Sequence, residues 1–274
     1  MAVRQKSGGK PDGGDDRPAI WAGYGKLVRL FRDKARLTQQ ELADAVGYSY
    51  EQGRRPAKHA FTEAAERVLG TGGVLAALQG DVERAKLPAF FQDFALLETE
   101  ASVRFAYETV VVPGLLQTED YARALLAAHC PPLDDEVIDH RLEARLNRQS
   151  LLRRKPMVDF AFVISEAALR CPVGGDSVLK NQLQHLLACA KLRNVEVQAM
   201  PLTHGAHAGL HGPMVLLETL DQQRVAYFES HGESLIISAP AKVSAFAQRY
   251  GKLRSQALNT EDSVRFIERI AGEL

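Results

Sequence analysis

Cysteine is scarce in this sequence, and long apolar segments are absent. The three cysteines, Cys130, Cys171 and Cys189, lie far apart, are odd in number and form no CxxC pair. This pattern fits reduced thiols in a cytosolic protein better than disulfides or a zinc site. No run approaches the roughly 20 apolar residues that span a bilayer, and the start of the chain lacks the apolar core of a signal peptide. We therefore expect a cytoplasmic protein without membrane contact.

Net charge is also lacking, although the charges are unevenly spread. The 274 residues carry 34 Lys and Arg against 34 Asp and Glu. Residues 1–60 hold 12 basic and 7 acidic side chains, so this part carries +5 and the remainder −5. A basic N-terminal part is typical of a protein that contacts nucleic acid through that part only. The length and the ordinary composition allow two globular domains.

Residues 36–56, RLTQQELADAVGYSYEQGRRP, carry the signals of two short helices joined by a tight turn. Thr38 can cap the first helix, and Glu41 completes a capping box. Gly47 supplies the left-handed residue that ends such a helix, and Ser49 is a second capping residue two positions later. Two short helices joined by a glycine turn predict a helix-turn-helix DNA reader.

The same residues resemble a known family. LTQQELADAVGYS, followed by Gly-Arg-Arg-Pro, is similar to the Cro-type, lambda-repressor-like (XRE-type) helix-turn-helix domains of bacterial regulators. The resemblance implies that the second helix lies in the major groove of double-stranded DNA, with Gln39 and Gln40 near phosphates and residues 49–52 opening the base-reading helix. The expected DNA-binding residues are Thr38, Gln39, Gln40, Ser49, Tyr50, Glu51, Gln52, Arg54, Arg55 and Lys58.

The sequence departs from this family at the second helix. Only Tyr50, Glu51 and Gln52 separate Ser49 from Gly53, which is less than one helical turn. The segment also has no aliphatic residue that would dock a recognition helix on the core. A second hypothesis therefore stands beside DNA reading: a degenerate helix-turn-helix attached to a protein-interaction module that does not bind DNA.

Periodicity predicts an α+β protein. The expected parts are a disordered tail (1–18), a helix-turn-helix domain (19–80), a linker helix (81–100) that Pro88 interrupts early, and an α+β domain (101–274) with a mostly antiparallel sheet. An aromatic cluster of Phe90, Phe91 and Phe94 on the linker predicts core or dimer packing, and we expect a homodimer. The expected strands are 102–111, 157–165, 195–201, 214–218, 224–230 and 234–238. The expected helices are 20–34, 58–69, 74–79, 118–129, 134–154, 176–192, 241–253 and 260–270.

The long second domain carries a resemblance of its own. The segments EASVRFAYETVVVPGLLQTEDYARALL, RLNRQSLL, SEAALRCPVGG and PLTHGAHAGLHGPMVLLE occur in a consistent order. They are similar to the large C-terminal domain of actinobacterial helix-turn-helix regulators (Scr-type) described as antitoxin-like. The resemblance implies a regulator that binds a small protein encoded nearby. That domain has no established catalytic activity, so we expect neither an enzyme nor a cofactor.

A histidine-rich loop, THGAHAGLHGP, is the first candidate site of this domain. Imidazoles are common zinc ligands, but the spacing matches no standard zinc motif, and no Cys or acidic residue lies in the loop. We therefore expect no metal here. The sequence favours a glycine-rich loop that contacts a partner or ligand through His204, His207 and His211.

Arginines recur along the helix expected at 134–154, and they allow two interpretations. Its basic end is favoured by the helix dipole alone. A phosphate-contacting surface that includes Arg141, Arg145 and Arg148 is the other interpretation. His140 and Ser150 lie on the same helix, but their spacing supports no Ser-His-Asp arrangement.

Overall fold

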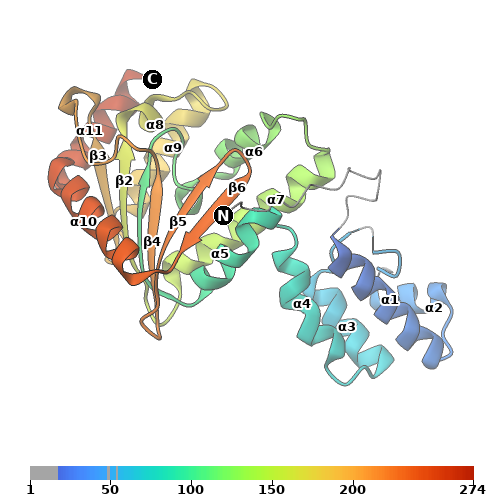
Figure 1. The fold of residues 1–274 in the computed structure, drawn as a ribbon. Helices are drawn as coiled ribbons and strands as arrows, with labels where there is room; N and C mark the ends of the chain where they lie inside the picture. Colours follow the sequence, from blue (N-terminus) through green and yellow to red (C-terminus); the bar gives the residue numbers. More distant parts are fainter. Residues whose placement is uncertain (1–17, 48–49, 54) are drawn as a thin grey trace, which may run out of the picture. The chain divides into compact units, whose positions relative to one another are not determined.

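The computed structural model describes residues 18–47, 50–53 and 55–274 (Figure 1). The chain folds as two compact units, with the boundary between Ala85 and Lys86. The expected α+β class is confirmed, because the described part of the first unit is helical and the second unit combines helices with a six-stranded sheet. No described helix is both long enough and apolar enough to cross a membrane.

Four helices make up the described part of the first unit: α1 (Ala19–Lys34), α2 (Gln39–Val46), α3 (His59–Leu69) and α4 (Val74–Arg84). They bury one core, which includes Trp21, Tyr24, Val28, Leu42, Phe61, Ala65, Leu75 and Val82. A buried hydrogen-bond chain links the Tyr24 hydroxyl to Thr62 and Thr62 to Gln79, whose amide donates to the Ala57 carbonyl. A satisfied polar chain of this kind fixes the register of the surrounding helices.

The linker helix expected at 81–100 is in fact two helices. Its first residues belong to α4, and α5 (Ala89–Thr99) begins after Pro88 and lies in the second unit. A single helix does not pass this position, because proline lacks a backbone N–H and disfavours helical geometry in the residue before it. Phe94 of α5 is fully buried in the core of the second unit. The side chain of Phe90 lies outside the described part of the structure.

The strands of the second unit form a sheet with the order β3-β2-β1-β4-β5-β6. They are β1 (Ala101–Glu108), β2 (Asp159–Ser165), β3 (Val195–Met200), β4 (Met214–Thr219), β5 (Arg224–Ser230) and β6 (Glu233–Ile237). Each lies within three residues of an expected strand, but the expectation of a mostly antiparallel sheet was wrong. The sheet is mixed, since β1–β2 and β2–β3 are parallel and the other three pairs are antiparallel. Parallel neighbours need long crossovers, which the helices between these strands supply.

Helices cover both faces of this sheet. They are α6 (Glu119–Ala127), α7 (Asp135–Arg148), α8 (Glu166–Arg170), α9 (Asp176–Cys189), α10 (Pro240–Gln256) and α11 (Thr260–Glu273), with α5. Tyr250 and Leu253 of α10 pack with Tyr107 and Met214 on one face. The apolar residues of α5, α9 and α11 pack on the other face. The helix expected at 134–154 ends at Arg148, and a 3-10 helix follows it.

Candidate functional site

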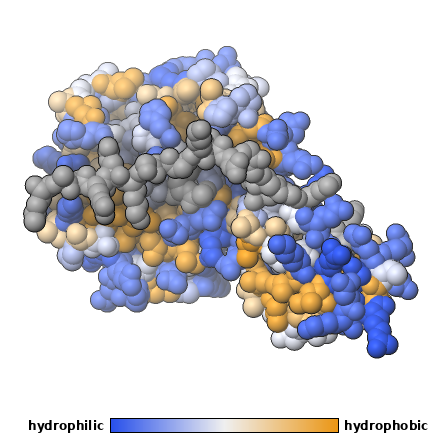
Figure 2. All heavy atoms as spheres, turned by 45° about the vertical axis from the view of Figure 1, so that its right-hand side comes forward, coloured by the Kyte–Doolittle hydropathy of each residue, from blue (hydrophilic) through white to orange (hydrophobic). Residues whose placement is uncertain are grey.

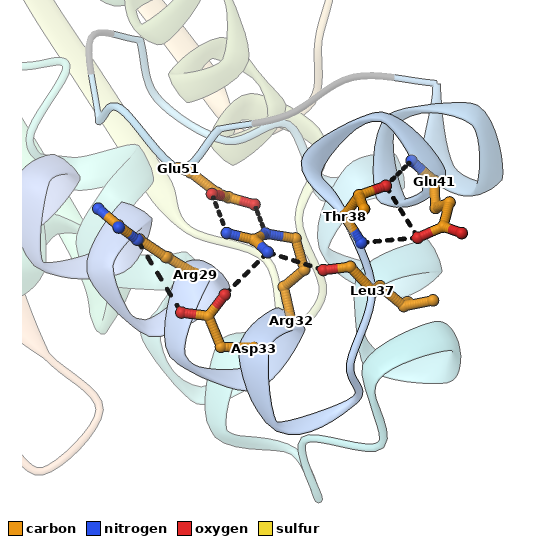
Figure 3. A network of polar contacts seen from close by, with 7 residues as sticks. All are labelled: Arg29, Arg32, Asp33, Leu37, Thr38, Glu41 and Glu51. Atoms are coloured by element: carbon orange, nitrogen blue, oxygen red, sulfur yellow. Dashed lines mark hydrogen bonds and ion pairs between the residues drawn. The ribbon is translucent and has the colours of Figure 1, made fainter.

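The start of α2 has the predicted capping box. The Thr38 hydroxyl oxygen accepts a hydrogen bond from the Glu41 backbone N–H at 3.2 Å, and the Glu41 carboxylate accepts one from the Thr38 N–H at 2.7 Å. Figure 3 shows these two residues facing each other. Gly47, with a φ of 87°, ends the helix as predicted. The Thr38 side chain is therefore engaged in capping, and Gln39 and Gln40 occupy the exposed first turn.

The second helix of the predicted motif is not found in residues 50–53. These residues form a turn, and the next helix is α3, which begins at His59. Ser49 and Arg54 lie outside the described residues. Three residues are too few to complete a helical turn, and Gly53 has a left-handed φ of 59° that interrupts any helix there.

The turn at residues 50–53 lies directly on the backbone of α1. A Cβ atom on Gly25 would be 2.7 Å from the carbonyl oxygens of both Tyr50 and Glu51. A Cβ atom on Gly53 would be 2.6 Å from the α1 backbone. Real Cβ atoms do not approach other atoms so closely, so the contact requires glycine on both sides. The short segment is thus a packed turn.

Tyr50 and Glu51, two of the residues expected to open the base-reading helix, contact other residues of the first unit. The carboxylate of Glu51, only 7% exposed, accepts hydrogen bonds from Nε and Nη2 of Arg32, whose Nη1 donates to a backbone carbonyl (Figure 3). Hydrogen bonding to this carboxylate raises the pKa of Arg32. The Tyr50 ring packs edge-on against Phe61, with centroids 4.5 Å apart. Gln52 is exposed.

The remaining predicted DNA contacts lie in two segments. Gln39 and Gln40 begin α2, and the Gln40 amide donates to Asp44 at 2.8 Å. Arg55 and Lys58 lie in the segment that precedes α3, and both are exposed. These four side chains are exposed to solvent.

The histidine loop brings two of its three histidines together. The rings of His204 and His207 have centroids 6.2 Å apart, and His207 lies edge-on to Tyr107. His207 Nδ1 accepts a hydrogen bond from the Gly209 N–H at 3.1 Å. Burial, followed by the neighbouring His204, lowers the pKa of His207. His211 is exposed, and no group of three or more His, Cys, Asp or Glu among the described residues is placed to hold a metal ion.

A cleft of about 910 Å³ opens in the second unit, beyond the carboxyl end of β1. Helices α5 and α7 and the end of β5 contribute to its walls. Its lining includes Phe91, Phe94, Arg104, Glu108, Val110, Val112, Arg141, Arg145, Arg148, Met214, Tyr227 and Glu229. Ligands of open α/β sheets bind outside the carboxyl ends of strands, and this volume is typical of small-molecule sites. We name this feature the arginine cleft.

Helix α7 contributes three arginines to the arginine cleft. Arg141, Arg145 and Arg148 are spaced by four and three residues, which places them on one face of the helix. Arg145 Nη1 donates to the Gln117 side-chain oxygen at 2.7 Å. Burial, and then the positive charge of Arg148, lowers the pKa of Arg145 to about 10. Within the described residues, neither Arg141 nor Arg145 has a carboxylate at ion-pair distance, although the more distant charge of Glu229 partly opposes the lowered pKa of Arg145.

A buried carboxylate, Glu98 of α5, holds two arginines of the cleft. It accepts hydrogen bonds from Arg104 Nε at 2.7 Å and from Arg148 Nε and Nη2 at 2.9 and 2.7 Å. Burial alone would raise the pKa of Glu98, but the charges of Arg148 and Arg104 hold it below its ordinary value. Arg104 is only 4% exposed, and its Nη1 is buried without a hydrogen-bond partner among the described residues.

The strand side of the cleft adds an unusual carboxyl group. Arg104 and Glu108 lie four residues apart on β1 and therefore share one face of the sheet. Burial raises the pKa of Glu108 to about 7, with Arg104 opposing the shift and Glu229 adding to it. The Tyr227 hydroxyl donates to Glu229 at 2.9 Å, and the Tyr227 ring stacks on Phe94 with centroids 4.0 Å apart. Guanidinium donors, a carboxyl that titrates near neutral pH and aromatic surface therefore meet in one cleft.

Sequence reasoning singled out the arginines of α7 but missed Glu98, Arg104, Glu108 and Tyr227. One signal was available: Arg104 and Glu108 are charged positions on the core-facing side of a largely apolar strand. Charged residues at such positions are rare unless they are paired. Glu98 gave no such signal, because one of its partners lies 50 residues away in the sequence.

The fold and the cleft define a protein with a small helical unit followed by a mixed-sheet α+β unit that carries a cationic cleft. The chain belongs to the family described as "Domain of unknown function (DUF5753)", whose sequence model matches residues 91–269. This match contains the whole sheet and the residues of the arginine cleft named above. Neither the curated proteins nor the solved structures contain a match to this chain.

Proposed function

We propose that this protein is a cytoplasmic transcriptional regulator of the helix-turn-helix, antitoxin-like type. Its first unit binds operator DNA, its second unit binds a small partner protein or ligand, and it acts by binding without catalysing a reaction. The observation that supports this proposal is the structure of α2. This helix begins at the capping box of Thr38 and Glu41, ends at Gly47 and packs into an all-helical core. These are the features that the DNA-reader pattern predicts for the first helix of the motif.

The proposed DNA contact relies on phosphates more than on bases. Backbone N–H groups at a helix N-terminus favour phosphate, and the exposed Gln39 and Gln40 flank this end of α2. Arg55 and Lys58 add exposed positive charge. The proposal assigns no base contact to Glu51, because Arg32 engages its carboxylate. Each bidentate base contact is worth about 1–3 kcal/mol of discrimination, so we expect weaker sequence preference than in regulators with a full recognition helix.

A homodimer is part of the proposal. Large hydrophobic side chains of the second unit are exposed: Leu96, Val110, Leu202, Leu210, Leu220 and Leu235. Figure 2 shows apolar surface interspersed with hydrophilic residues on the visible face. Leu235 lies on β6, an outer strand of the sheet that can pair with another strand. A dimer would present two first units to DNA half-sites about one helical turn, roughly 34 Å, apart.

DNA binding is tested by mobility shifts of a promoter duplex over a salt series. We expect a shift at about 50 mM salt that weakens strongly by about 200 mM, because binding to phosphate releases counterions. Lys58→Gln should lower the slope of log Kobs against log salt by about one. The matched control is Lys252→Gln, a change at an exposed lysine of α10 that should leave the slope unchanged. Absence of a shift at low salt would contradict the proposal.

A second candidate function is favoured by the packed turn at residues 50–53. If the glycine contacts with α1 and the Arg32–Glu51 ion pair leave no helix for the major groove, the protein is an antitoxin-like interaction module without DNA binding. The same salt series separates the two functions. This candidate predicts no shift at any salt concentration while the second unit still binds its partner or ligand.

A further inference from the structure

We propose that the arginine cleft is the binding site for a small organic anion, with a carboxylate or phosphate group against Arg141 and Arg145 and an apolar body against Phe91 and Val110. This proposal deepens the proposed function, since it names the ligand class of the second unit. It does not depend on DNA binding. The match that defines the family assigns no ligand or site.

The α7 wall of the cleft carries positive charge. Arg148 shares the buried carboxylate of Glu98 with Arg104, whereas Arg141 and Arg145 have no carboxylate at ion-pair distance within the described part of the chain. Both side chains are half-buried, and this burial lowers the pKa of Arg141 and Arg145. An anion between them would offset this lost solvation and the repulsion between neighbouring guanidinium groups.

Arg104, which lines the same cleft, has a buried donor without a hydrogen-bond partner among the described residues. Arginine has five N–H donors, and Arg104 uses Nε for Glu98 while Nη1 is buried without a partner among the described residues. Buried donors are nearly always paired in folded proteins. The Arg104 guanidinium is held in place by Glu98 and lies over the Phe162 ring, with Cζ 5.5 Å from the ring centroid. Arg104 is therefore a fixed, incompletely bonded donor in a wall of the cleft.

The size of the cleft and its apolar lining fit a small organic molecule. The volume of about 910 Å³ is within the range of pockets that hold small molecules. The rings of Phe91, Phe94 and Tyr227 pack against one another, and Arg148 lies over Phe91 at 4.3 Å. Apolar side chains that follow β1 continue this surface. A bare inorganic ion would use only the charged wall, so the lining favours an anion with an aromatic or aliphatic body.

The proposal is tested by calorimetric titration of the full chain with 2-naphthoate and 1-naphthyl phosphate. Neutral 2-naphthol and cationic 1-naphthylmethylamine have the same ring system and serve as ligand controls. Inorganic phosphate serves as the control without an apolar body. We expect at least one naphthyl anion to bind about tenfold or more tightly than each control ligand. Whichever of the two binds better identifies the preferred anionic group.

Protein variants locate the binding. Arg141→Gln and Arg145→Gln should each weaken binding of the naphthyl anion about tenfold. Arg141→Gln removes no hydrogen bond formed by the described residues, so it remains informative if the loss of the Arg145–Gln117 bond unfolds the other variant. Arg224→Gln changes an exposed arginine of β5 outside the cleft and should leave binding unchanged. The proposal is overturned if neither anion binds, if the control ligands bind equally well, or if both cleft variants bind as the unmodified protein does.

Discussion

Glu98→Ala is expected to lower the free energy of unfolding of the second unit by about 3–5 kcal/mol at neutral pH. The carboxylate is 1% exposed and pairs with both Arg104 and Arg148. Its removal leaves two guanidinium groups without their counter-charge in a poorly solvated place, and that cost exceeds the net stabilisation from the intact pair. Urea denaturation followed by circular dichroism measures the change.

An exposed ion pair provides the matched control for Glu98→Ala. Glu196→Ala also removes the carboxylate partner of an arginine, Arg254, but this pair is exposed to solvent, and such pairs contribute about 1 kcal/mol or less. The difference in stability loss between Glu98→Ala and Glu196→Ala should depend on pH. Because the folded-state pKa of Glu98 is depressed, its contribution is present above its ordinary pKa and is lost as the pH falls through the depressed value. A loss similar to that of Glu196→Ala would show that the Glu98 cluster is not buried in solution.

Glu108→Gln is expected to stabilise the second unit at pH 8 and to have a much smaller effect at pH 5. Burial raises the pKa of Glu108 from 4.5 to about 7, so the folded protein at pH 8 contains a poorly solvated carboxylate. This ionisation costs up to about 3 kcal/mol, and the cost falls below about 1 kcal/mol near pH 5, where the folded protein keeps the proton. Glutamine has the same shape and no charge to desolvate. Urea denaturation at the two pH values measures both effects.

The pH dependence of Glu108→Gln reflects the charges around this carboxyl group. Arg104 on β1 and Glu229 on β5 act on it most directly. The other charged or titratable groups that line the cleft are Arg141, Arg145 and Arg148 of α7, Tyr227 of β5, and His129, Cys130 and His231. Glu233→Gln, at an exposed position of β6, serves as the control and should change stability little at either pH. Equal effects of Glu108→Gln at pH 5 and pH 8 would contradict a raised pKa.

Local patterns predicted the elements of this fold better than their arrangement. Short runs rich in strand-forming residues located the six strands, and the capping signals at Thr38 and Gly47 located α2. The pairing direction of the strands was missed, although the helices expected between 102–111, 157–165 and 195–201 are the crossovers that parallel neighbours need. The capping signal at Ser49 did not lead to a helix in residues 50–53. A cap starts a helix only if enough residues follow to form it, and Gly53 comes too soon.

The candidate site was only partly predictable from the sequence. The spacing of Arg141, Arg145 and Arg148 predicted a cationic helix face, and this face forms one wall of the cleft. The residues that make this wall specific come from distant elements, since Glu98 lies on α5 and Tyr227 on β5. Contacts between such elements exist only after folding, so residue spacing alone gives no signal for them.

Hydrogen–deuterium exchange of the full chain, with promoter duplex and with the naphthyl anion added separately, tests the central claim that the two units bind different partners. We predict that the duplex slows exchange in peptides from residues 36–47. We predict that the anion slows exchange in peptides from residues 101–112 and 135–148, which carry much of the arginine cleft. Protection of the second unit by DNA alone, or of the first unit by the anion alone, would contradict this account.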